Sequence, residues 1–322
     1  MWPAVPAITC FTLLLLVCPA FAQEGDVTFK ASVANVRVDA QVTQDGELVT
    51  GLTAQDFIVR EDNRPQPIVY FGREKEPLSL LLLLDVSGSM RKYVEQVASV
   101  AQQSLRFLRV KDRVALMVFA REANVRMDFT DDMNAVASEL SAAAADESVG
   151  TATNINEALL TAANYMEEKS GDSGGRKAVL ILTDNLGLNY RSPDQPVIDA
   201  LHESNTVMNA IVVGKGQRPS PLSKGRTLNP DFTPPDVFTI AEQTGGEAVK
   251  AERAGEAFNR MIERIRTRYS IHYNMPNPGV AGFRRIDVEL TPAAKLRYPR
   301  AEVRARKGYR VGGRAITRSK AN

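Results

Sequence analysis

Cysteine and histidine, two residue types that often build catalytic and metal sites, are scarce in this chain of 322 residues. The cysteines are Cys10 and Cys18, and the histidines are His202 and His272. Two histidines far apart in sequence argue against a histidine-based metal cluster and against a Ser-His-Asp hydrolase. Both cysteines fall within the first 22 residues, so a chain that loses this segment folds without disulfides.

The chain also lacks a strong net charge and long apolar runs. Lys and Arg number 40 against 38 Asp and Glu, which leaves a formal net charge of only +2. This balance provides no global basic field, so we expect no nucleic-acid partner. Hydrophobic residues make up 44% and charged residues 24%, a composition typical of a globular protein. After residue 22, no run reaches the roughly 18 apolar residues that a membrane helix needs.

The C-terminal end is locally basic. From Arg300 to Lys320, eight Lys or Arg residues accompany one acid, Glu302. We interpret residues 311–322 as a solvated basic tail, with contact to an anionic membrane surface as the alternative.

The N-terminal end is typical of a secretory signal peptide. An apolar run at 11–17 is followed by Pro19 and then by Ala20-Phe21-Ala22, a small-x-small cleavage pattern. No Lys or Arg precedes the run, and an uncleaved anchor is the alternative. We therefore expect a signal peptide at 1–22 and an exported protein that is periplasmic, attached to the cell envelope, or secreted.

Hydrophobic periodicity divides the rest of the chain into three stretches. Residues 27–72 alternate apolar and polar positions, as at Val36, Val38, Ala40 and Val42, which predicts an antiparallel β segment. Residues 77–268 alternate continuous apolar runs with amphipathic helical patterns, and residues 269–310 return to a period of two. We expect the two β segments to pair into one discontinuous domain, because chain termini often lie close together.

The middle stretch predicts an α/β fold. The run at 78–84 is apolar at nearly every position, which is typical of a strand buried on both faces. Strands that alternate with helices predict a three-layer, doubly wound, mostly parallel sheet, here with flanking antiparallel β segments. We expect strands at 78–84, 114–120, 125–129, 178–183, 207–213 and 247–251, and helices near 94–108, 133–145, 155–168, 193–203, 238–242 and 258–265.

Oxygen-bearing side chains follow the predicted strands. Asp85, Ser87 and Ser89 come directly after the first buried strand, Asp184 follows the strand at 178–183, and Thr153 precedes a helix. In an open parallel sheet, ligands bind outside the carboxyl ends of the strands. Two carboxylates and three hydroxyls, with no nitrogen or sulfur, favour Mg²⁺, Mn²⁺ or Ca²⁺. Thr151, two residues earlier, could supply the third hydroxyl in place of Thr153. We predict no catalytic residue and no organic cofactor.

This pattern resembles the metal-ion-dependent adhesion site of the von Willebrand factor type A (VWA) fold, which reads Asp-x-Ser-x-Ser, then Thr, then Asp. The run from Thr153 to Leu159 is similar to the Thr-x-x-x-x-Ala-Leu run of that family, which favours Thr153 over Thr151. The resemblance therefore implies a complete set of predicted metal ligands: Asp85, Ser87, Ser89, Thr153 and Asp184. Asn185 departs from the family, which usually carries Gly there. The resemblance covers about 77–268. At the flanks, residues 51–57 and 307–309 resemble the exported bacterial "VWFA-related" proteins found notably in acidobacteria.

The resemblance implies binding rather than bond breaking. In the family, residues matching Ser87, Ser89 and Thr153 contact the ion, and the Asp side chains contact it partly through water. A partner's Asp or Glu carboxylate then completes the coordination. We therefore expect an exported, non-catalytic, adhesion-type domain that binds a protein or peptide in a divalent-cation-dependent manner. A structural scaffold of the cell envelope with a vestigial metal site is the alternative.

An enzymatic alternative rests on Ser89-Met90-Arg91-Lys92, which fits the Ser-x-x-Lys motif of penicillin-binding hydrolases. Lys169-Ser170-Gly171 loosely matches their Lys-Thr-Gly motif. We do not favour this reading, because Lys169 is expected to end a helix rather than to lie on a strand.

Overall fold

The structure is a computed structural model. Besides Met1, it describes residues 34–73, 76–145, 153–171, 175–187, 189–219 and 232–312. The expected signal peptide, Thr151 and the chain beyond residue 312 lie outside the described residues. None of the described helices combines the length and the apolar character that crossing a membrane requires.

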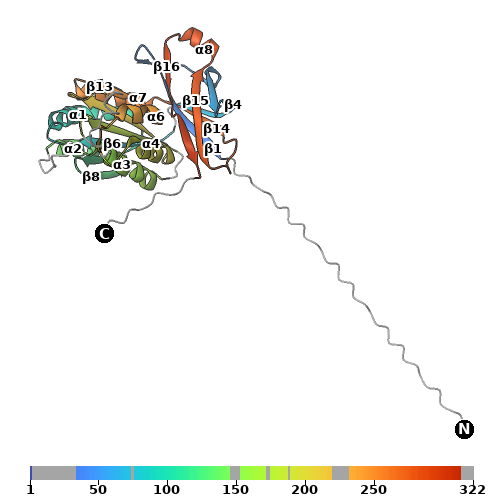
Figure 1. Ribbon diagram of the computed structural model, residues 1–322, viewed down its shortest axis with the longest axis horizontal. Helices are drawn as coiled ribbons and strands as arrows, with labels where there is room; N and C mark the ends of the chain where they lie inside the picture. The colour runs from blue at the N-terminus through green and yellow to red at the C-terminus, as the bar shows by residue number, and fades with distance from the viewer. Residues whose placement is uncertain are drawn as a thin grey trace. The chain divides into compact units, whose positions relative to one another are not determined.

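A six-stranded sheet forms the centre of the α/β part (Figure 1). Its strand order is β13-β11-β9-β6-β7-β8. All neighbouring strands are parallel except β7 and β8. Only residues 120–122 separate these two strands, which is too short for the crossover that a parallel pair needs. The strands are β6 (Leu78–Asp85), β7 (Arg113–Phe119), β8 (Ala123–Thr130), β9 (Arg176–Thr183), β11 (Thr206–Val213) and β13 (Ala248–Ala251).

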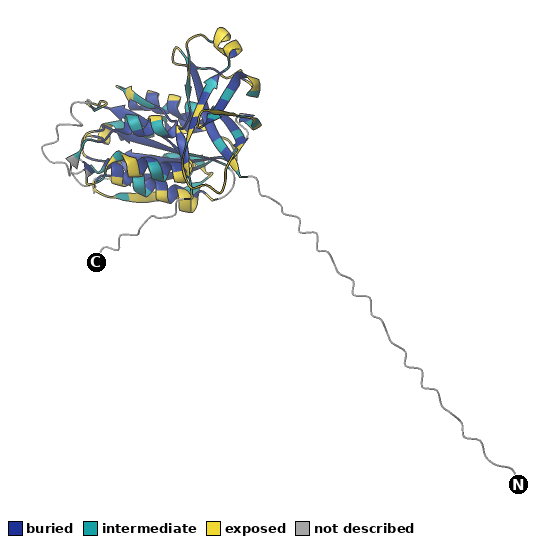
Figure 2. Ribbon diagram, turned by 45° about the vertical axis from the view of Figure 1, so that its right-hand side comes forward, coloured by how far each residue is buried: buried dark blue, intermediate teal, exposed yellow. Residues whose placement is uncertain are grey.

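Helices cover both faces of this sheet, so the predicted three-layer α/β fold is confirmed (Figure 1). Side chains alternate along a strand. Accordingly, Leu80, Leu82 and Leu84 of β6 pack with one set of helices, and Leu81 and Leu83 pack with the other. One face carries α1 (Arg91–Ser104), α2 (Met133–Ala145) and α7 (Ala254–Arg266), with the short 3-10 helix η2 (Leu105–Phe107). The other carries α3 (Ile155–Lys169), α4 (Asp194–Glu203) and α6 (Val237–Thr244). Figure 2 shows the central strands buried between half-buried and exposed helix faces.

The β part is built from both ends of the described chain. One sheet contains β1 (Asn35–Gln44), β2 (Glu47–Leu48), β5 (Ile68–Arg73), β14 (Tyr269–Asn274) and β16 (Ala301–Arg304). The other contains β3 (Phe57–Glu61), β4 (Arg64–Gln66), β15 (Gly282–Leu290) and β17 (Gly308–Val311). Strand β1 pairs antiparallel with β14 and β16, and β3 pairs with β15. Apolar side chains from both segments share one core.

Short elements complete the fold. Strands β10 (Asn189–Tyr190) and β12 (Phe232–Thr233) pair beside α3, and a 3-10 turn, η1 (Ala54–Asp56), precedes β3. Helix α8 (Pro292–Arg297) follows β15 and was not expected from the sequence. Its signal is a capping pattern: the Thr291 hydroxyl accepts a hydrogen bond from the Ala294 amide, and proline occupies the first turn.

Buried arginines join the β part to the α/β part. Arg176, at the start of β9, donates to the carbonyl of Arg266 at the end of α7 over 2.9 Å, and its Nε lies 3.5 Å from the carboxylate of Asp39 on β1. Burial alone would raise the pKa of Asp39, but Arg37 and Arg176 outweigh it and hold this pKa well below its usual range. Asp39 is therefore an ionised carboxylate inside an arginine-rich junction.

Candidate metal centre

The candidate site lies where two central strands end. Strands β6 and β9 are parallel neighbours, with Leu84 opposite Leu182, so their carboxyl ends meet at one edge of the sheet. Asp85 is the last residue of β6, and Asp184 directly follows β9. The order of the strands therefore brings together two carboxylates that are 99 positions apart in the sequence.

Asp85 is the most buried member of the site, with 0% of its surface exposed. Its Oδ1 accepts a hydrogen bond from the backbone amide of Ser87 over 3.1 Å, and its Oδ2 accepts one from the Thr183 hydroxyl over 3.0 Å. The turn closes when the Met90 amide donates to the Ser87 carbonyl over 2.8 Å, and the buried Met90 side chain fixes the start of α1. Sequence reasoning missed Thr183, although its position next to Asp184 was a usable signal.

A hydrogen bond joins the first motif to the last. The Ser89 hydroxyl donates to Oδ2 of Asp184 over 2.9 Å, and the Leu186 amide donates to Oδ1 of the same carboxylate over 3.0 Å. Asp85 with Ser87 and Asp184 with Ser89 thus form two hydrogen-bonded pairs at the edge of the sheet, close enough for the charge of Asp184 to act on Asp85.

Thr153 lies next to this group but is not bonded to it. A Cβ placed on Gly187 would come within 2.9 Å of the Thr153 carbonyl, so Thr153 lies beside the loop that follows Asp184. The neighbouring Asn154 amide donates to the Ala120 carbonyl over 2.9 Å, which fixes the start of α3 against β7. Among the described residues, the Thr153 hydroxyl makes no hydrogen bond to the other four predicted ligands.

The loop after β9 needs unusual backbone geometry. Asn185 has φ of +51°, a left-handed conformation that glycine adopts freely and asparagine tolerates. The departure from the family's glycine is therefore compatible with the turn, and the Asn185 side chain adds a hydrogen bond to the Gln217 carbonyl over 3.1 Å. Gly216 packs on the same loop, and a Cβ there would lie 2.0 Å from the Asp184 carbonyl oxygen. Sequence reasoning did not single out Gly216.

The electrostatics of this edge suit a cation. Burial raises the pKa of Asp85 to about 6; hydrogen bonds from Ser87 and Thr183 oppose this shift, and the charge of Asp184 adds to it. Within the described chain, no Lys or Arg side chain hydrogen-bonds to either carboxylate. No group of three His, Cys, Asp or Glu side chains forms a metal cluster in the same residues. A metal site would therefore have to combine carboxylates with hydroxyls, and this donor set fits a hard divalent cation.

The side chains of the penicillin-binding-hydrolase motifs make other contacts among the described residues. Lys92 Nζ lies 4.7 Å from the centre of the Tyr93 ring, whereas the Ser89 hydroxyl donates to Asp184. Lys169 is the last residue of α3. His202 is near the end of α4, and His272 is on β14 in the β part.

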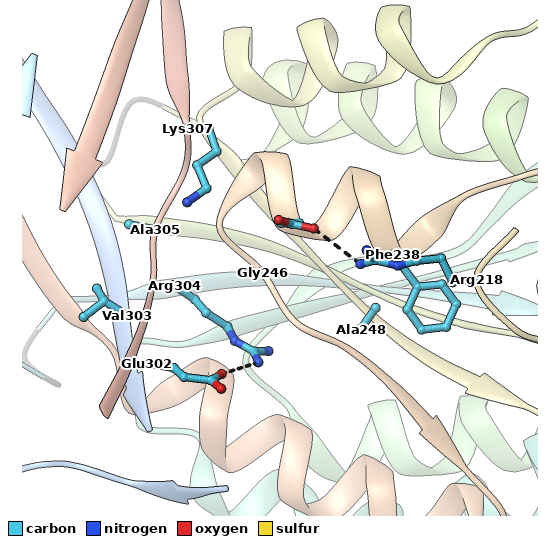
Figure 3. Close-up of a pocket in the computed structure, with 10 residues that line it drawn as sticks. Arg218, Phe238, Gly246, Ala248, Glu302, Val303, Arg304, Ala305 and Lys307 are labelled. Carbon is cyan, nitrogen blue, oxygen red and sulfur yellow. Dashed lines mark hydrogen bonds and ion pairs between the residues drawn. The ribbon is translucent and has the colours of Figure 1, made fainter. Parts of the chain in front are cut away.

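A separate hollow of about 470 Å³ lies between α6, β13 and the segment of β16 (Figure 3). Lys307 has no ion-pair partner among the described residues, whereas the other four charged lining side chains pair with each other: Arg304 contacts Glu302 over 3.0 Å, and Arg218 contacts Glu242 over 3.4 Å. Because these charges already have partners, we expect this hollow to attract a charged ligand less strongly than the edge of the sheet beside Asp85 does.

Comparison with known proteins agrees with the fold. Residues 80–187 match the family model of the von Willebrand factor type A domain, so the chain carries a VWA domain. Three solved structures are similar. An aerotolerance-related membrane protein from Bacteroides fragilis has 18% identity over 58% of this chain and 98% of its own, with a TM-score of 0.44. BatB from Bacteroides thetaiotaomicron has 18% identity over 58% and 97%, with a TM-score of 0.41. Proximal thread matrix protein 1 of the mussel byssus has 14% identity over 64% and 51%, with a TM-score of 0.48. No curated protein matches the chain.

Proposed function

We propose that this protein is a non-catalytic binding protein that grips a protein or peptide partner through a divalent cation. The cation would be held by Asp85, Ser87, Ser89, Thr153 and Asp184. The proposal also places the protein outside the cytoplasm, in the cell envelope or beyond, on the strength of the signal-peptide pattern at 1–22.

The hydrogen bond between Ser89 and Asp184 is the observation that carries this proposal. It brings side chains from two distant segments into direct contact, next to a carboxylate that is fully buried. A buried carboxylate beside a second one is unfavourable unless protons or a cation balance the charge. An oxygen-only donor set of this kind favours Mg²⁺, Mn²⁺ or Ca²⁺ as the balancing ion.

The chain's own residues set how a partner would be held. When bound, a divalent cation would supply a positive charge and a coordination position for an Asp or Glu carboxylate of the partner. Thr183 and the Ser87 amide orient Asp85, and the Leu186 amide orients Asp184, so the donor oxygens are arranged before the ion arrives. Leu186 is 49% exposed beside the site and offers the partner an apolar contact.

Metal binding is tested by titrating the protein with Mn²⁺ and counting free ion by electron paramagnetic resonance. We expect the wild type to bind the ion, and Asp85→Asn and Asp184→Asn to bind it at least about tenfold more weakly, since each removes a charged donor. Asp131→Asn is the matched control, because this exposed carboxylate follows β8 at the opposite edge of the sheet. Ser89→Ala is a milder variant if loss of the buried carboxylate prevents folding. Equal affinity in the wild type and all of these variants would contradict the proposed site.

Partner binding needs a separate experiment. Crosslinking mass spectrometry in the native organism, with and without chelator, should show partner crosslinks that chelator and Asp85→Asn both remove. Crosslinks that persist under both conditions would instead support the alternative function, an envelope scaffold with a vestigial site.

A further inference from the structure

A second hollow, of about 550 Å³, lies where the α/β part meets the β part. We call it the junction pocket and define it by Arg37, Lys177, His202, Glu203, Arg306 and Arg310, which all line it. Lys177 is near the start of β9, whereas Asp184 follows the end of that strand. At about 3.3 Å per residue, the two ends are roughly 23 Å apart. The junction pocket is therefore a separate place from the candidate metal centre.

Arg306 is the central feature of the junction pocket. It is only 7% exposed, and its Nη1 donates to Oδ1 of Asn205 over 2.7 Å. Its Nε is buried and has no hydrogen-bond partner among the described residues. Nor does Arg306 form an ion pair with any described carboxylate, whereas Lys177 pairs with Glu167 and Arg310 pairs with Asp199. The charge of Asp39 acts on Arg306 from a distance, and the guanidinium lies 5.5 Å from the centre of the Tyr309 ring, but neither group satisfies the Nε–H. A buried guanidinium with an unsatisfied N–H and no direct ion pair is costly, and an oxyanion would supply both.

His202, which also lines the junction pocket, has a second unsatisfied atom. It is 3% exposed, its Nε2 lies 3.0 Å from the Gln243 carbonyl, and its Nδ1 has no partner among the described residues. Burial lowers the pKa of His202, and the charges of Arg306 and Arg310 lower it further. The neutral ring therefore donates from Nε2, and Nδ1 becomes a donor only when the ring takes up a second proton.

We propose that the junction pocket binds a small anionic ligand through a carboxylate or phosphate group, which accepts hydrogen bonds from Arg306 Nε and from protonated His202. The planar guanidinium matches the geometry of these oxyanions, and Lys177 and Arg310 add positive charge at the rim. Among the described lining residues Glu203 is the one acid, and it opposes the anion while it is ionised. This proposal stands independently of the proposed metal-dependent function.

The proposed site predicts that the anion binds together with a proton. An anion beside His202 favours the charged ring, so binding raises the pKa of this histidine and takes up a proton. The charged groups that face His202 are Arg306, Arg310 and Asp199, and Phe283 stacks on the ring. Burial and the charge of Asp199 raise the pKa of Glu203, so protonation of Glu203 acts in the same direction. Affinity should therefore rise as the pH falls from about 8 to about 6, the range around the ordinary histidine pKa.

The test is calorimetric titration of the full chain with sulfate, inorganic phosphate and oxalate at low salt. The charges of sulfate and oxalate stay constant over this pH range, so a pH effect with these two probes belongs to the protein. The ranking of phosphate and sulfate against oxalate tells which oxyanion class the pocket prefers. We expect Arg306→Gln to weaken binding about tenfold or more. His202→Gln should reduce the pH dependence, leaving only what Glu203 and His272, which also lines the pocket, contribute. Arg300→Gln is the matched control, because that exposed arginine pairs with Asp45 away from the pocket.

A thermal measurement keeps the proposal testable if Arg306→Gln folds poorly. The wild type should gain melting temperature with added sulfate, because a ligand that binds only the folded state stabilises it. Arg310→Gln and Lys177→Gln, on partly exposed side chains, should fold and show a smaller gain. The proposal is overturned if no probe binds the wild type. It is also overturned if Arg306→Gln binds the probes as tightly as the control Arg300→Gln does. If Arg306→Gln does not fold, the same conclusion follows when Arg310→Gln and Lys177→Gln gain as much melting temperature from sulfate as Arg300→Gln.

Discussion

At the residue scale, the two carboxylates of the candidate site are held in different ways. Asp85 is buried and accepts from Thr183 and the Ser87 amide, whereas Asp184 accepts from Ser89 and the Leu186 amide. Asp85 is therefore oriented by the turn that follows β6 and by Thr183 at the end of β9. Asp184 is oriented by Ser89 of that same turn and by the amide of Leu186. The residues that hold these carboxylates deserve separate tests from the carboxylates themselves.

Thr183→Val tests the support of Asp85. The change removes a donor to Asp85 and the oxygen that accepts from the Asn185 amide over 3.1 Å. Loss of a residue that orients a metal ligand typically costs 10- to 100-fold in metal affinity, so we expect at least about tenfold weaker Mn²⁺ binding. The free energy of unfolding in urea should fall by about 1–3 kcal/mol. Thr161→Val is the control, because that hydroxyl bonds only to Glu157 of its own helix. Unchanged Mn²⁺ affinity in Thr183→Val would show that Asp85 needs no such support.

Asn185 tests the backbone of the same loop. Asn185→Ala places a Cβ at a φ of +51° and removes the bond to Gln217, so we expect the free energy of unfolding to fall by about 1–2 kcal/mol. Asn185→Gly removes the same bond but relieves the left-handed conformation, and it should cost less than the alanine variant. Chemical denaturation of both variants measures the order. A glycine variant less stable than the alanine variant would contradict this reading of the loop.

At the element scale, Arg176 connects three segments: β9, the end of α7 and β1. Arg176→Gln leaves Asp39 buried without one of its cations and removes donors to the last carbonyls of α7. Breaking a buried pair from one side typically costs 3–5 kcal/mol, and we expect a loss of about 3 kcal/mol in urea unfolding. Arg113→Gln is a comparison at the start of β7 in the same sheet, since that side chain is only partly buried and bonds to Ser170. A loss no larger than in Arg113→Gln would mean that the junction tolerates an unpaired Asp39.

The same junction predicts a pH dependence. The folded pKa of Asp39 is well below its usual range, so its stabilising contribution is full above the unfolded value of about 3.9 and is lost as the pH falls below it. Asp39→Asn should therefore be less stable than the wild type at neutral pH, and this difference should shrink as the pH falls below about 4. Urea unfolding at several pH values measures the difference. A constant difference across that range would mean that the pKa of Asp39 is the same in the folded and the unfolded protein.

Local sequence patterns predicted the α/β elements well because burial dictates their composition. All eight residues of β6 are buried, as the continuous apolar run indicated. The antiparallel direction of β8 was not predicted, because direction depends on the length of the connection and not on the strand's own pattern. Helix α8 was missed because it is six residues long and too short to show a periodic apolar stripe.

At the scale of the whole molecule, the predicted fold class is confirmed, whereas the predicted metal ligands remain predictions. The sequence placed Asp85 and Asp184 at strand ends, and the strand order explains why they meet. The junction pocket was beyond sequence reasoning, because Arg306 and His202 are about 100 positions apart and carry no motif. Their shared position depends on how the β part packs on the α/β part.

The core of the β part lets us test whether its strands unfold as one cooperative unit. Tyr273 and Tyr309 donate to the buried carboxylate of Glu61 over 2.7 and 2.9 Å, which ties β14 and β17 to β3. Tyr273→Phe removes one donor, so we expect a loss of about 1–3 kcal/mol. Hydrogen exchange should then accelerate together in β1, β3 and β14, because they share one core. Tyr70→Phe, on a partly exposed ring, is the control. Faster exchange in β14 alone would show that the strands do not open as a unit.

Because β1 pairs with β14 and β16, the order of synthesis matters. When the ribosome has made β1, the two-residue β2 follows at once, but the partners β14 and β16 are still about 225 residues or more away along the message. At about 5–20 residues per second, the first strand waits roughly 10 to 45 s for β14 to be translated. During this interval its apolar side chains remain uncovered by their final partners, so the nascent chain needs protection from association until translation is nearly complete.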